Sequence, residues 1–367
     1  MRILVVTVVH HPDDARIRRR QVGALIAAGH TVTMAAPWSA VGADPVDVRA
    51  VDLPRAVGRA RARALGSAVS LLRRQGGAYD LILIHDPELL LAVWLARPAA
   101  PVVWDVHEDA AAALVDRPWM PGALRRVAAL LIHCFESWAE RRLRLILAED
   151  GYQDRFRRRH PVIRNLPPVA AQQPRAAVRP QVVYVGRVSL LRGAGDMIAL
   201  GRRLAAAGID LHLVGPVDGD VESMVRSAAA DGVVTWHGFV PNEKALELVD
   251  GSLAGLSLLH DISNYRVSAP TKVYEYLSRG VPVVTSPLPI PRGIVEAHDV
   301  GLVADLDDLD AMAAFITHLR DAPDVRLQMG ARAYAVALRE FNWSREADRF
   351  VAVLEQAAGR QRGSPDD

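Results

Sequence analysis

Two arginines in the second half of the chain lie in a short loop bounded by glycines. Arg187 and Arg192 are placed between Gly186 and Gly193, after a β-branched run and before a helical pattern. A helix N-terminus offers free N–H groups and a partial positive charge, and guanidinium groups bind phosphate oxygens well. The loop therefore suits a diphosphate, although two solvated arginines in an arginine-rich chain would give the same pattern.

A lysine and a glutamate form a second candidate cluster. The turn at Pro270 leads into a predicted helix that begins at Thr271, and Lys272 and Glu275 share one face of it. We expect the helix start and Lys272 to bind phosphate. The Glu275 carboxylate is expected to accept hydrogen bonds from two hydroxyl groups of a ribose. An ordinary surface ion pair is the alternative. Of the 44 basic residues, Lys244 is the only other lysine, in an ordinary polar helix start.

Histidines and a carboxylate follow three predicted strands of the first half: His10 and His11, His85 and Asp86, and His107. Ligands of open α/β sheets bind at the carboxyl ends of the strands, so these side chains are candidates for a binding site. For His85 a hydrogen-bonded histidine at a strand end is an equal alternative, and for His107 a surface histidine near a helix cap.

Several common kinds of site are disfavoured by the motifs. The loop after the first strand lacks the G-x-G-x-x-G of dinucleotide sites, and neither G-x-x-x-x-G-K-[ST] nor G-x-S-x-G occurs. The single cysteine, Cys134, excludes an internal disulfide, and in the apolar stretch Val127–Phe135 we expect it to be buried. No histidine and aspartate cluster has metal-ligand spacing on one element, so no metal is expected.

The elements that must position these residues alternate along the chain. Short runs such as Thr31–Ala36 alternate with helical patterns such as Ala15–Ala28, which predicts an α/β fold with parallel strands. A proline-rich stretch interrupts the pattern, which restarts at Val182–Val185. We expect two doubly wound, Rossmann-like domains with these boundaries: an N-terminal domain at 1–166, a linker at 167–180, a C-terminal domain at 181–343, a last helix at 344–358 and a disordered tail at 359–367.

The overall composition is that of a globular protein. The 367 residues include 44 basic and 42 acidic ones, a net charge of +2, which argues against a nucleic-acid partner. No apolar run approaches the roughly 18 residues of a membrane span, and the first apolar run is too short for a signal peptide. A cytoplasmic location is therefore expected.

Five segments together resemble the retaining glycosyltransferases of the GT-B fold in family 4. The loop 186–193 is similar to the family's G-R-x-x-x-x-K-G, and 270–284 is similar to its P-x-K-x-x-E-Y-x-x-x-G-x-P-V-V. The first half contributes Asp13-Asp14-Ala15-Arg16-Ile17, His85-Asp86-Pro87-Glu88-Leu89 and Trp104-Asp105-Val106-His107-Glu108. The segments follow the family's order and span residues 1–358.

The resemblance implies two facing domains with a cleft between them, the last helix packing back on the N-terminal domain. It also implies transfer of a sugar, with retention, from a UDP- or GDP-sugar to a hydroxyl of a glycan, lipid-linked or small-molecule acceptor. The nucleotide sugar is then a co-substrate, and no cofactor is needed. Arg187, Arg192 and Lys272 would neutralise the diphosphate leaving group, and His107 would contact the donor sugar or orient the acceptor.

The same resemblance gives binding roles to further residues. The donor would be bound by Gly186, Gly193, Thr271, Glu275 and, near the base, Gly238, Phe239 and Val240. The acceptor would be faced by His10, His11, Arg16, His85 and Asp86. Asp105 and Glu108 would set the tautomer and charge of His107.

Two positions depart from the family pattern. Many members carry a glutamate eight residues before the one matched by Glu275, but Val267 stands there, and Asp261 or Asn264 would have to replace its contact. Arg192 stands where the family often has lysine, and arginine also binds phosphate. Because of Val267, an inactive sugar-nucleotide-binding subunit stays as an alternative. A GT-B epimerase, which would need acid and base side chains around the sugar in the second half, is another.

Arginines give the predicted N-terminal domain a basic character. Arg16, Arg18, Arg19 and Arg20 lie in one predicted helix, and others stand at positions 125, 126, 141, 142 and 144. The helix would present either a solvated face or a contact with an acceptor phosphate or anionic lipid. Together with the apolar tip Trp119-Met120-Pro121, this makes a peripheral contact with the inner face of the cell membrane one expectation.

Overall fold

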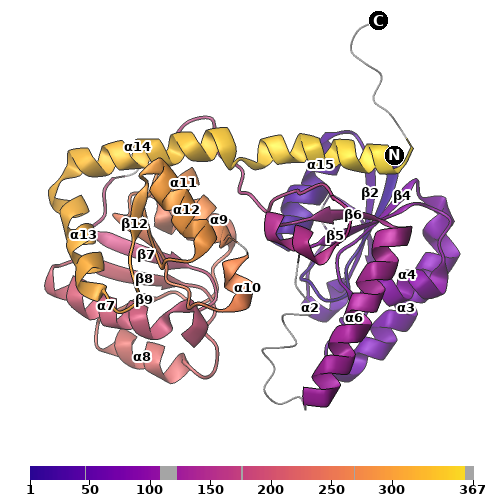
Figure 1. Ribbon diagram of the computed structural model, residues 1–367, viewed down its shortest axis with the longest axis horizontal. Helices are drawn as coiled ribbons and strands as arrows, with labels where there is room; N and C mark the ends of the chain where they lie inside the picture. Colours follow the sequence, from indigo (N-terminus) through magenta and orange to yellow (C-terminus); the bar gives the residue numbers. More distant parts are fainter. Residues whose placement is uncertain (46, 108–121, 175–176, 268, 360–367) are drawn as a thin grey trace, which may run out of the picture. The chain divides into compact units, whose positions relative to one another are not determined.

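The computed structural model of the chain describes residues 1–45, 47–107, 122–174, 177–267 and 269–359 (Figure 1). The expected tip Trp119-Met120-Pro121, Glu108 and the tail residues 360–367 lie outside these ranges. The chain folds into two compact units. Unit 1 comprises Met1–Asn165 and Arg345–Asp367, and unit 2 comprises Leu166–Ser344.

Unit 1 is built on a parallel sheet of six strands in the order β3-β2-β1-β4-β5-β6. The strands are β1 (Arg2–Val6), β2 (Thr31–Ala36), β3 (Arg49–Asp52), β4 (Leu81–Ile84), β5 (Val102–Val106) and β6 (Arg144–Leu147). The central strands are buried on both faces and read as nearly continuous apolar runs, which is why the sequence predicts them well.

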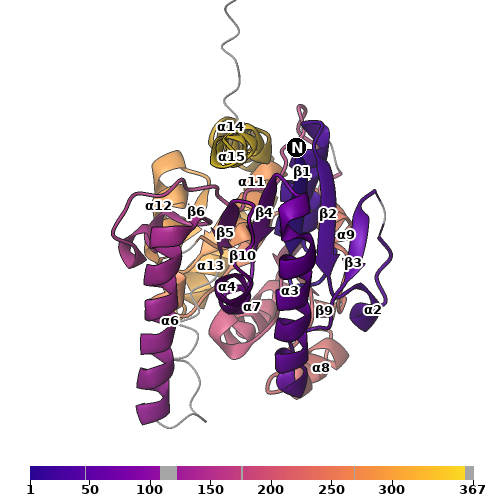
Figure 2. The same ribbon diagram turned by 90° about the vertical axis from the view of Figure 1, so that its right-hand side faces the viewer.

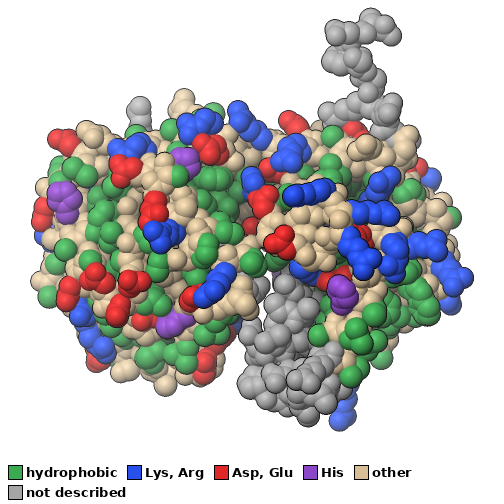
Figure 3. All heavy atoms as spheres, in the orientation of Figure 1, with side chains coloured by type: hydrophobic (Ala, Val, Ile, Leu, Met, Phe, Trp, Pro, Cys, Tyr) green, Lys and Arg blue, Asp and Glu red, His purple; other side chains and the backbone are tan. Residues whose placement is uncertain are grey.

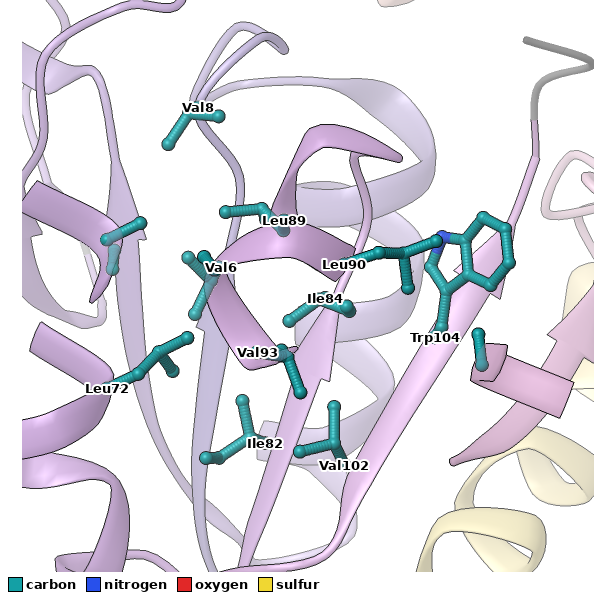
Figure 4. Packing of buried hydrophobic residues seen from close by; sticks show 14 of the residues in the cluster. Val6, Val8, Leu72, Ile82, Ile84, Leu89, Leu90, Val93, Val102 and Trp104 are labelled. Carbon is teal, nitrogen blue, oxygen red and sulfur yellow. The ribbon is translucent and has the colours of Figure 1, made fainter. Parts of the chain in front are cut away.

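Three helices cover one face of this sheet: α3 (Arg61–Gln75), α4 (Glu88–Ala96) and α6 (Gly122–Arg142) (Figure 2). The core between them joins Ile82 and Ile84 of β4 to Leu72 of α3 and to Leu90 and Val93 of α4 (Figure 4). The remaining helices of the unit are the π-helix η1 (Ala15–Val22), α1 (Gly23–Ala27), α2 (Trp38–Val41), α15 (Trp343–Ala357) and the 3₁₀ turns η2 (Gly58–Ala60), η3 (Gly76–Ala78) and η4 (Asp150–Arg155).

Unit 2 repeats this plan with a second parallel sheet of six strands, ordered β12-β11-β10-β7-β8-β9. Its strands are β7 (Gln181–Val185), β8 (Asp210–Val214), β9 (Thr235–Trp236), β10 (Ala254–Ser257), β11 (Val283–Thr285) and β12 (Gly301–Val303). Its helices are η5 (Leu190–Arg192), α7 (Ala194–Ala206), α8 (Glu222–Ala230), α9 (Asn242–Val249), α10 (Ser263–Arg266), α11 (Thr271–Ser278), α12 (Pro289–His298), α13 (Leu309–Asp321) and α14 (Pro323–Glu340).

The prediction of two doubly wound α/β halves is confirmed by these sheets. Strands β3 and β12, each at one edge of its sheet, were not predicted, because neither carries a buried apolar run; Arg49, Ala50 and Asp52 of β3 are exposed, and the three residues of β12 are only partly buried. The edge strands on the other sides, β6 and β9, were predicted. The predicted helix Ala15–Ala28 is the π-helix η1 followed directly by the short α1.

The expectation of a buried thiol at Cys134 is wrong, because this residue is exposed on α6. The same helix packs Trp138 and Ala139 against the core, while Leu130 and Leu131 are exposed like the cysteine. An amphipathic helix buries a single stripe of residues, so an apolar stretch of sequence can lie partly on its outer side.

Candidate active site

The loop that follows β7 is shaped by glycines. Gly186 has φ +130° and Gly193 has φ +81°, backbone conformations that favour glycine. A Cβ on Gly193 would lie 2.3 Å from the carbonyl oxygen of Leu258, and one on Gly215 would lie 2.1 Å from the carbonyl oxygen of Gly186. These close approaches fix residues 186–193 against the strand ends, directly before α7.

The two arginines of this loop lie in different surroundings. Arg187 is exposed, and its Nη1 donates to Asp218 Oδ1 at 2.7 Å. Arg192 is partly buried beside the hydroxyl groups of Tyr184 and Tyr265. An exposed ion pair stabilises a protein little, so an anion can compete with Asp218 for Arg187.

Lys272, in the first turn of α11, is buried and forms no ion pair with any residue that the structure describes. Its Nζ lies 3.8 Å from the centroid of the Tyr184 ring, and a Cβ on Gly186 would be 3.4 Å away from it. Burial holds the pKa of Lys272 well below its usual value, and the charge of Arg192 lowers this pKa further. The charge of Glu275 raises the pKa, but it offsets only part of this lowering. A buried ammonium beside a second cation is stabilised by an anion, so this site is complementary to phosphate.

Glu275 is buried one turn along α11 and accepts a hydrogen bond from Asn242 Nδ2 at 2.9 Å. Asn242 begins α9, shortly after the predicted base-binding residues 238–240. Within that segment Gly238 has φ +67° and Phe239 is 79% exposed, while Val240 packs against the core. The sequence analysis missed Asn242, and its only signal is its place directly behind this segment.

The residues proposed to replace the first glutamate do not form an evident substitute. Val267 is partly buried, and Asp261 is exposed and binds Arg266 through two contacts, at 2.5 Å and 2.6 Å. The side chain of Asn264 lies outside the described part. Thr271 is the first residue of α11, as predicted from the sequence.

In unit 1, Asp86 is fully buried at the end of β4 and is held by the loop after β1. It accepts hydrogen bonds from Thr7 Oγ1 at 3.0 Å and from the backbone N–H of Val8 at 2.5 Å. It also lies 2.6 Å from His10 Nδ1. Burial alone would raise the pKa of Asp86, but the hydrogen bond and charge of His10 together with the Val8 N–H lower it.

His10 connects Asp86 to His107, whose Nε2 lies 3.2 Å from His10 Nε2. The Nδ1 of His107 lies 3.1 Å from the carbonyl oxygen of Asp105, which can only accept a hydrogen bond. Through these contacts Asp86, His10 and His107 form one connected group of polar side chains.

The protonation of His107 is set mainly by burial. Burial lowers the pKa of His107 to about 4, and the charge of His10 also lowers it, against the opposing effect of Asp105. His107 is therefore neutral at neutral pH.

A buried ion pair between Arg16 and Asp105 lies against His107. Arg16 Nε and Nη2 donate to the two Asp105 carboxylate oxygens at 2.8 Å and 2.6 Å, and Nη2 also donates to the carbonyl oxygen of Ile163 at 3.0 Å. Gln21 Nε2 donates to Asp105 Oδ2 at 2.8 Å. Burial opposes the charge of Asp105, but Arg16 outweighs it and keeps the pKa of this carboxyl well below its usual value.

The expected contact of the first helix with an acceptor phosphate or lipid is corrected for two of its arginines. Arg16 is buried and occupied by Asp105, and Arg20 is buried and donates to Asn165. Arg16 and Arg20 therefore form neither a solvated face nor a contact with an external anion, because this side of η1 packs into the protein. His11 is exposed, and its Nδ1 accepts from a backbone N–H at 3.1 Å.

His85 completes a group that has the composition of a metal site. Its Nδ1 lies 3.3 Å from Asp105 Oδ2, and the ligand atoms of His85, Asp105 and His107 lie within 4.8 Å of one another. Arg16, however, already binds both oxygens of Asp105 and places a positive charge next to them. The donor set is therefore better suited to positioning histidines than to binding a cation.

The fold and parts of the sequence match known proteins. The family model described as Glycosyl transferase-like matches residues 197–352. The alpha-D-kanosaminyltransferase of Streptomyces kanamyceticus is 24% identical over 182 residues, which are 48% of this chain and 46% of that protein. The chain thus spans less than half the length of this relative.

Solved structures match the whole chain. The sucrose-phosphate synthase of Thermosynechococcus elongatus has a TM-score of 0.73 at 18% identity, with 97% of this chain and 98% of that chain covered. Anabaena HepE in complex with UDP-glucose has a TM-score of 0.70 at 15% identity, with 97% and 100% covered. The fold is GT-B. The comparisons thus show the GT-B fold over the whole chain and a match to the Glycosyl transferase-like model within its second half.

The Arg16–Asp105 pair predicts a large loss of stability when it is broken. In Arg16→Met the Asp105 carboxylate stays buried without its main partner, so the free energy of unfolding should fall by about 3–5 kcal/mol. Arg19→Met is the matched control, since Arg19 binds Asp13 at an exposed site worth about 0–1 kcal/mol. Denaturant unfolding measures both, and equal losses would contradict the structural role of Arg16.

The lowered pKa of His107 predicts a loss of stability in mild acid. At pH values between the usual histidine pKa and about 4, His107 is protonated in the unfolded chain but not in the folded protein. The free energy of unfolding therefore decreases as the pH falls through this range. The variant His107→Gln should lose less stability than the wild type between pH 7 and pH 5, as measured by thermal unfolding. Identical pH profiles would show that His107 titrates normally in the folded protein.

Proposed function

We propose that this protein is a retaining glycosyltransferase of the family 4 type, which transfers a sugar from a UDP- or GDP-sugar to an acceptor hydroxyl. The observation that carries the proposal is the buried side chain of Lys272, which has no ion-pair partner among the described residues and lies beside the glycine loop and Arg192. A diphosphate supplies the missing negative charge. Glu275 on the same helix is placed for the hydroxyl groups of the ribose, and Asn242 orients its carboxylate.

The chemistry asked of unit 2 is stabilisation of a leaving group. When the bond between the anomeric carbon and the diphosphate breaks, negative charge grows on the β-phosphate oxygens. Lys272, Arg192 and Arg187 are fixed before the reaction, as are the N-terminal N–H groups of α7 and α11. Such preorganised charge stabilises the transition state without reorganisation, which is the largest contribution in many enzymes.

The acceptor is assigned to unit 1, where the histidine pair lies. His107 orients the acceptor hydroxyl or contacts the donor sugar, and His10 positions His107 through their Nε2 contact. No protein nucleophile is part of the proposal: the leaving phosphate takes the acceptor proton on the face from which it departs, and this gives retention. His85, Arg16 and Asp105 act as positioning residues below this pair.

Two observations bear on the nucleotide of the proposed donor. HepE was solved in complex with UDP and with UDP-glucose, which supports a uridine or a related nucleotide sugar as donor. The exposed ring of Phe239 and the backbone at Gly238 do not distinguish uracil from guanine, so the proposal includes both UDP-sugars and GDP-sugars as donors. The nucleotide sugar is consumed as co-substrate, and the proposed scheme uses neither a metal nor a cofactor.

A peripheral contact with an anionic membrane is proposed for the basic surface of unit 1. No helix of the described residues is long and apolar enough to cross a membrane. Exposed arginines gather at the end of α6 and in the loop after η4: Arg141, Arg142, Arg144, Arg157, Arg158 and Arg159. Figure 3 shows basic side chains gathered on this unit above an area of hydrophobic ones.

Co-sedimentation with vesicles tests this membrane contact. Binding to vesicles that contain anionic lipid should weaken when salt screens the arginines, and vesicles of neutral lipid should leave the protein in the supernatant. Equal binding to both kinds of vesicle would contradict an electrostatic contact.

Kinetics of nucleotide release test the proposed activity. Lys272→Ala should lower kcat by about 10²–10³-fold, the usual effect of removing one preorganised stabilising group. Glu275→Ala should raise the donor KM by about tenfold or more through the lost hydrogen bonds to the ribose. Lys244→Ala is the matched control, because this other lysine is exposed and forms a surface ion pair with Glu247.

The assay measures free UDP or GDP in the presence of candidate donors and an acceptor extract. Unchanged kinetics in both the Lys272 and Glu275 variants would overturn the site assignment. If no donor yields free nucleotide although it raises the unfolding temperature, the protein is an inactive sugar-nucleotide-binding subunit.

A further inference from the structure

Unit 1 contains a pocket of about 550 Å³ beside the histidine pair. It is bounded by the loop after β1, the start of α3, the α4 helix and the middle of α6. The lining residues at its inner side include Val8, Leu89, Leu90 and Trp104, all labelled in Figure 4. Its volume lies within the range of pockets that bind small molecules, about 300–1,000 Å³.

The lining is apolar, and the charged groups in it are already paired. Arg61, the one cation among the lining residues, binds Glu88 at 2.5 Å, and Glu136 is bound by Arg155. The third carboxylate, Asp86, is held by hydrogen bonds from the loop after β1. Among the described lining residues the pocket therefore offers no unpaired cation to a phosphate, and its chemistry fits an uncharged apolar group.

The pocket reaches the proposed reaction centre through Asp86. This residue lines the pocket and also lies 2.6 Å from His10 Nδ1, and His10 contacts His107. Asp86 therefore links one side of the pocket to the histidine pair. At the other side Leu131 lines the pocket and is 54% exposed, so the opening is apolar as well.

One polar group of the lining lacks a partner. Trp104 is 1% exposed, and its indole Nε1 has no hydrogen bond in the structure. The nitrogen lies on the side of the ring that faces Leu90, another lining residue (Figure 4). Buried N–H groups are rarely left without an acceptor, and an oxygen of a ligand that moves the Leu90 side chain would provide one.

We propose that this pocket binds an uncharged apolar group that the acceptor carries next to its reacting hydroxyl. The inference rests on the proposed glycosyltransferase function and narrows its acceptor to hydroxyl compounds with an apolar ring or chain. A phosphorylated or purely polar sugar would leave the pocket empty. An acceptor of this kind fills the apolar volume with its ring or chain and places its hydroxyl at the Asp86 side of the pocket, the side of the histidine pair.

Alkyl β-D-glucosides of increasing chain length, from ethyl to octyl and below their micelle concentrations, are suitable probes. Calorimetric titration should show that the Kd decreases about two- to fourfold for each added methylene, as expected when the chain enters an apolar pocket. A Kd that does not depend on chain length would overturn the proposal.

A pair of variants on α3 separates the pocket from unspecific binding. Ala62 lines the pocket and is exposed, so Ala62→Trp fills the space without disturbing the core, and the octyl glucoside should bind at least tenfold more weakly. Gln75→Trp adds the same ring to an exposed position of the same helix away from the pocket, and should bind like the wild type. Equal Kd values for the two variants would show that the probe binds elsewhere.

Nucleotide release and the increase in unfolding temperature with UDP or GDP, measured on the same samples, keep the two hypotheses apart. If the glucosides bind as predicted but no donor is consumed, the proposed function fails and the pocket remains. If a donor is consumed with some acceptor while the Kd is independent of chain length, the pocket proposal fails alone.

Discussion

The first half of the candidate site depends on the buried ion pair between Arg16 and Asp105. The guanidinium binds both carboxylate oxygens and also a carbonyl oxygen of the chain near β6, so it joins the π-helix η1, the end of β5 and residue 163. His85 and His107 both lie against Asp105, and their positions follow from this pair. Burying an ion pair costs desolvation free energy. Here the buried pair holds Asp105 in place, and with it the side chains of His85 and His107.

The two units treat buried charge in opposite ways. In unit 1 each buried carboxylate of the site has its cation or N–H donors, so the charges are balanced within the protein. In unit 2 the Lys272 ammonium is buried next to Arg192 and lacks a bound anion in the described part of the chain. This difference matches the proposed division of labour, in which unit 1 orients a neutral acceptor and unit 2 receives a diphosphate.

The sequence predicted much of the fold, because the central strands are buried on both faces and carry apolar runs that stand out from the helices between them. Strands β3 and β12 were not predicted because their short sequences carry no buried apolar run. The exposed Cys134 was misjudged because an apolar stretch does not reveal which helical face packs inward. The Lys272 and Glu275 cluster was recognised because both residues lie on one helix. Arg16 was assigned to the surface because its partner lies 89 residues away, and Asn242 was missed for the same reason.

The most direct test of the account is whether Lys272 takes up a proton when a diphosphate binds. Calorimetric titration with UDP or GDP at mildly alkaline pH, in buffers of different ionisation enthalpy, measures this uptake. Since the pKa of buried Lys272 is held well below its usual value, binding should raise the pKa and draw a proton from the buffer. The account predicts uptake in the wild type and in Lys244→Ala and its loss in Lys272→Ala. Binding without proton uptake in the wild type would contradict it.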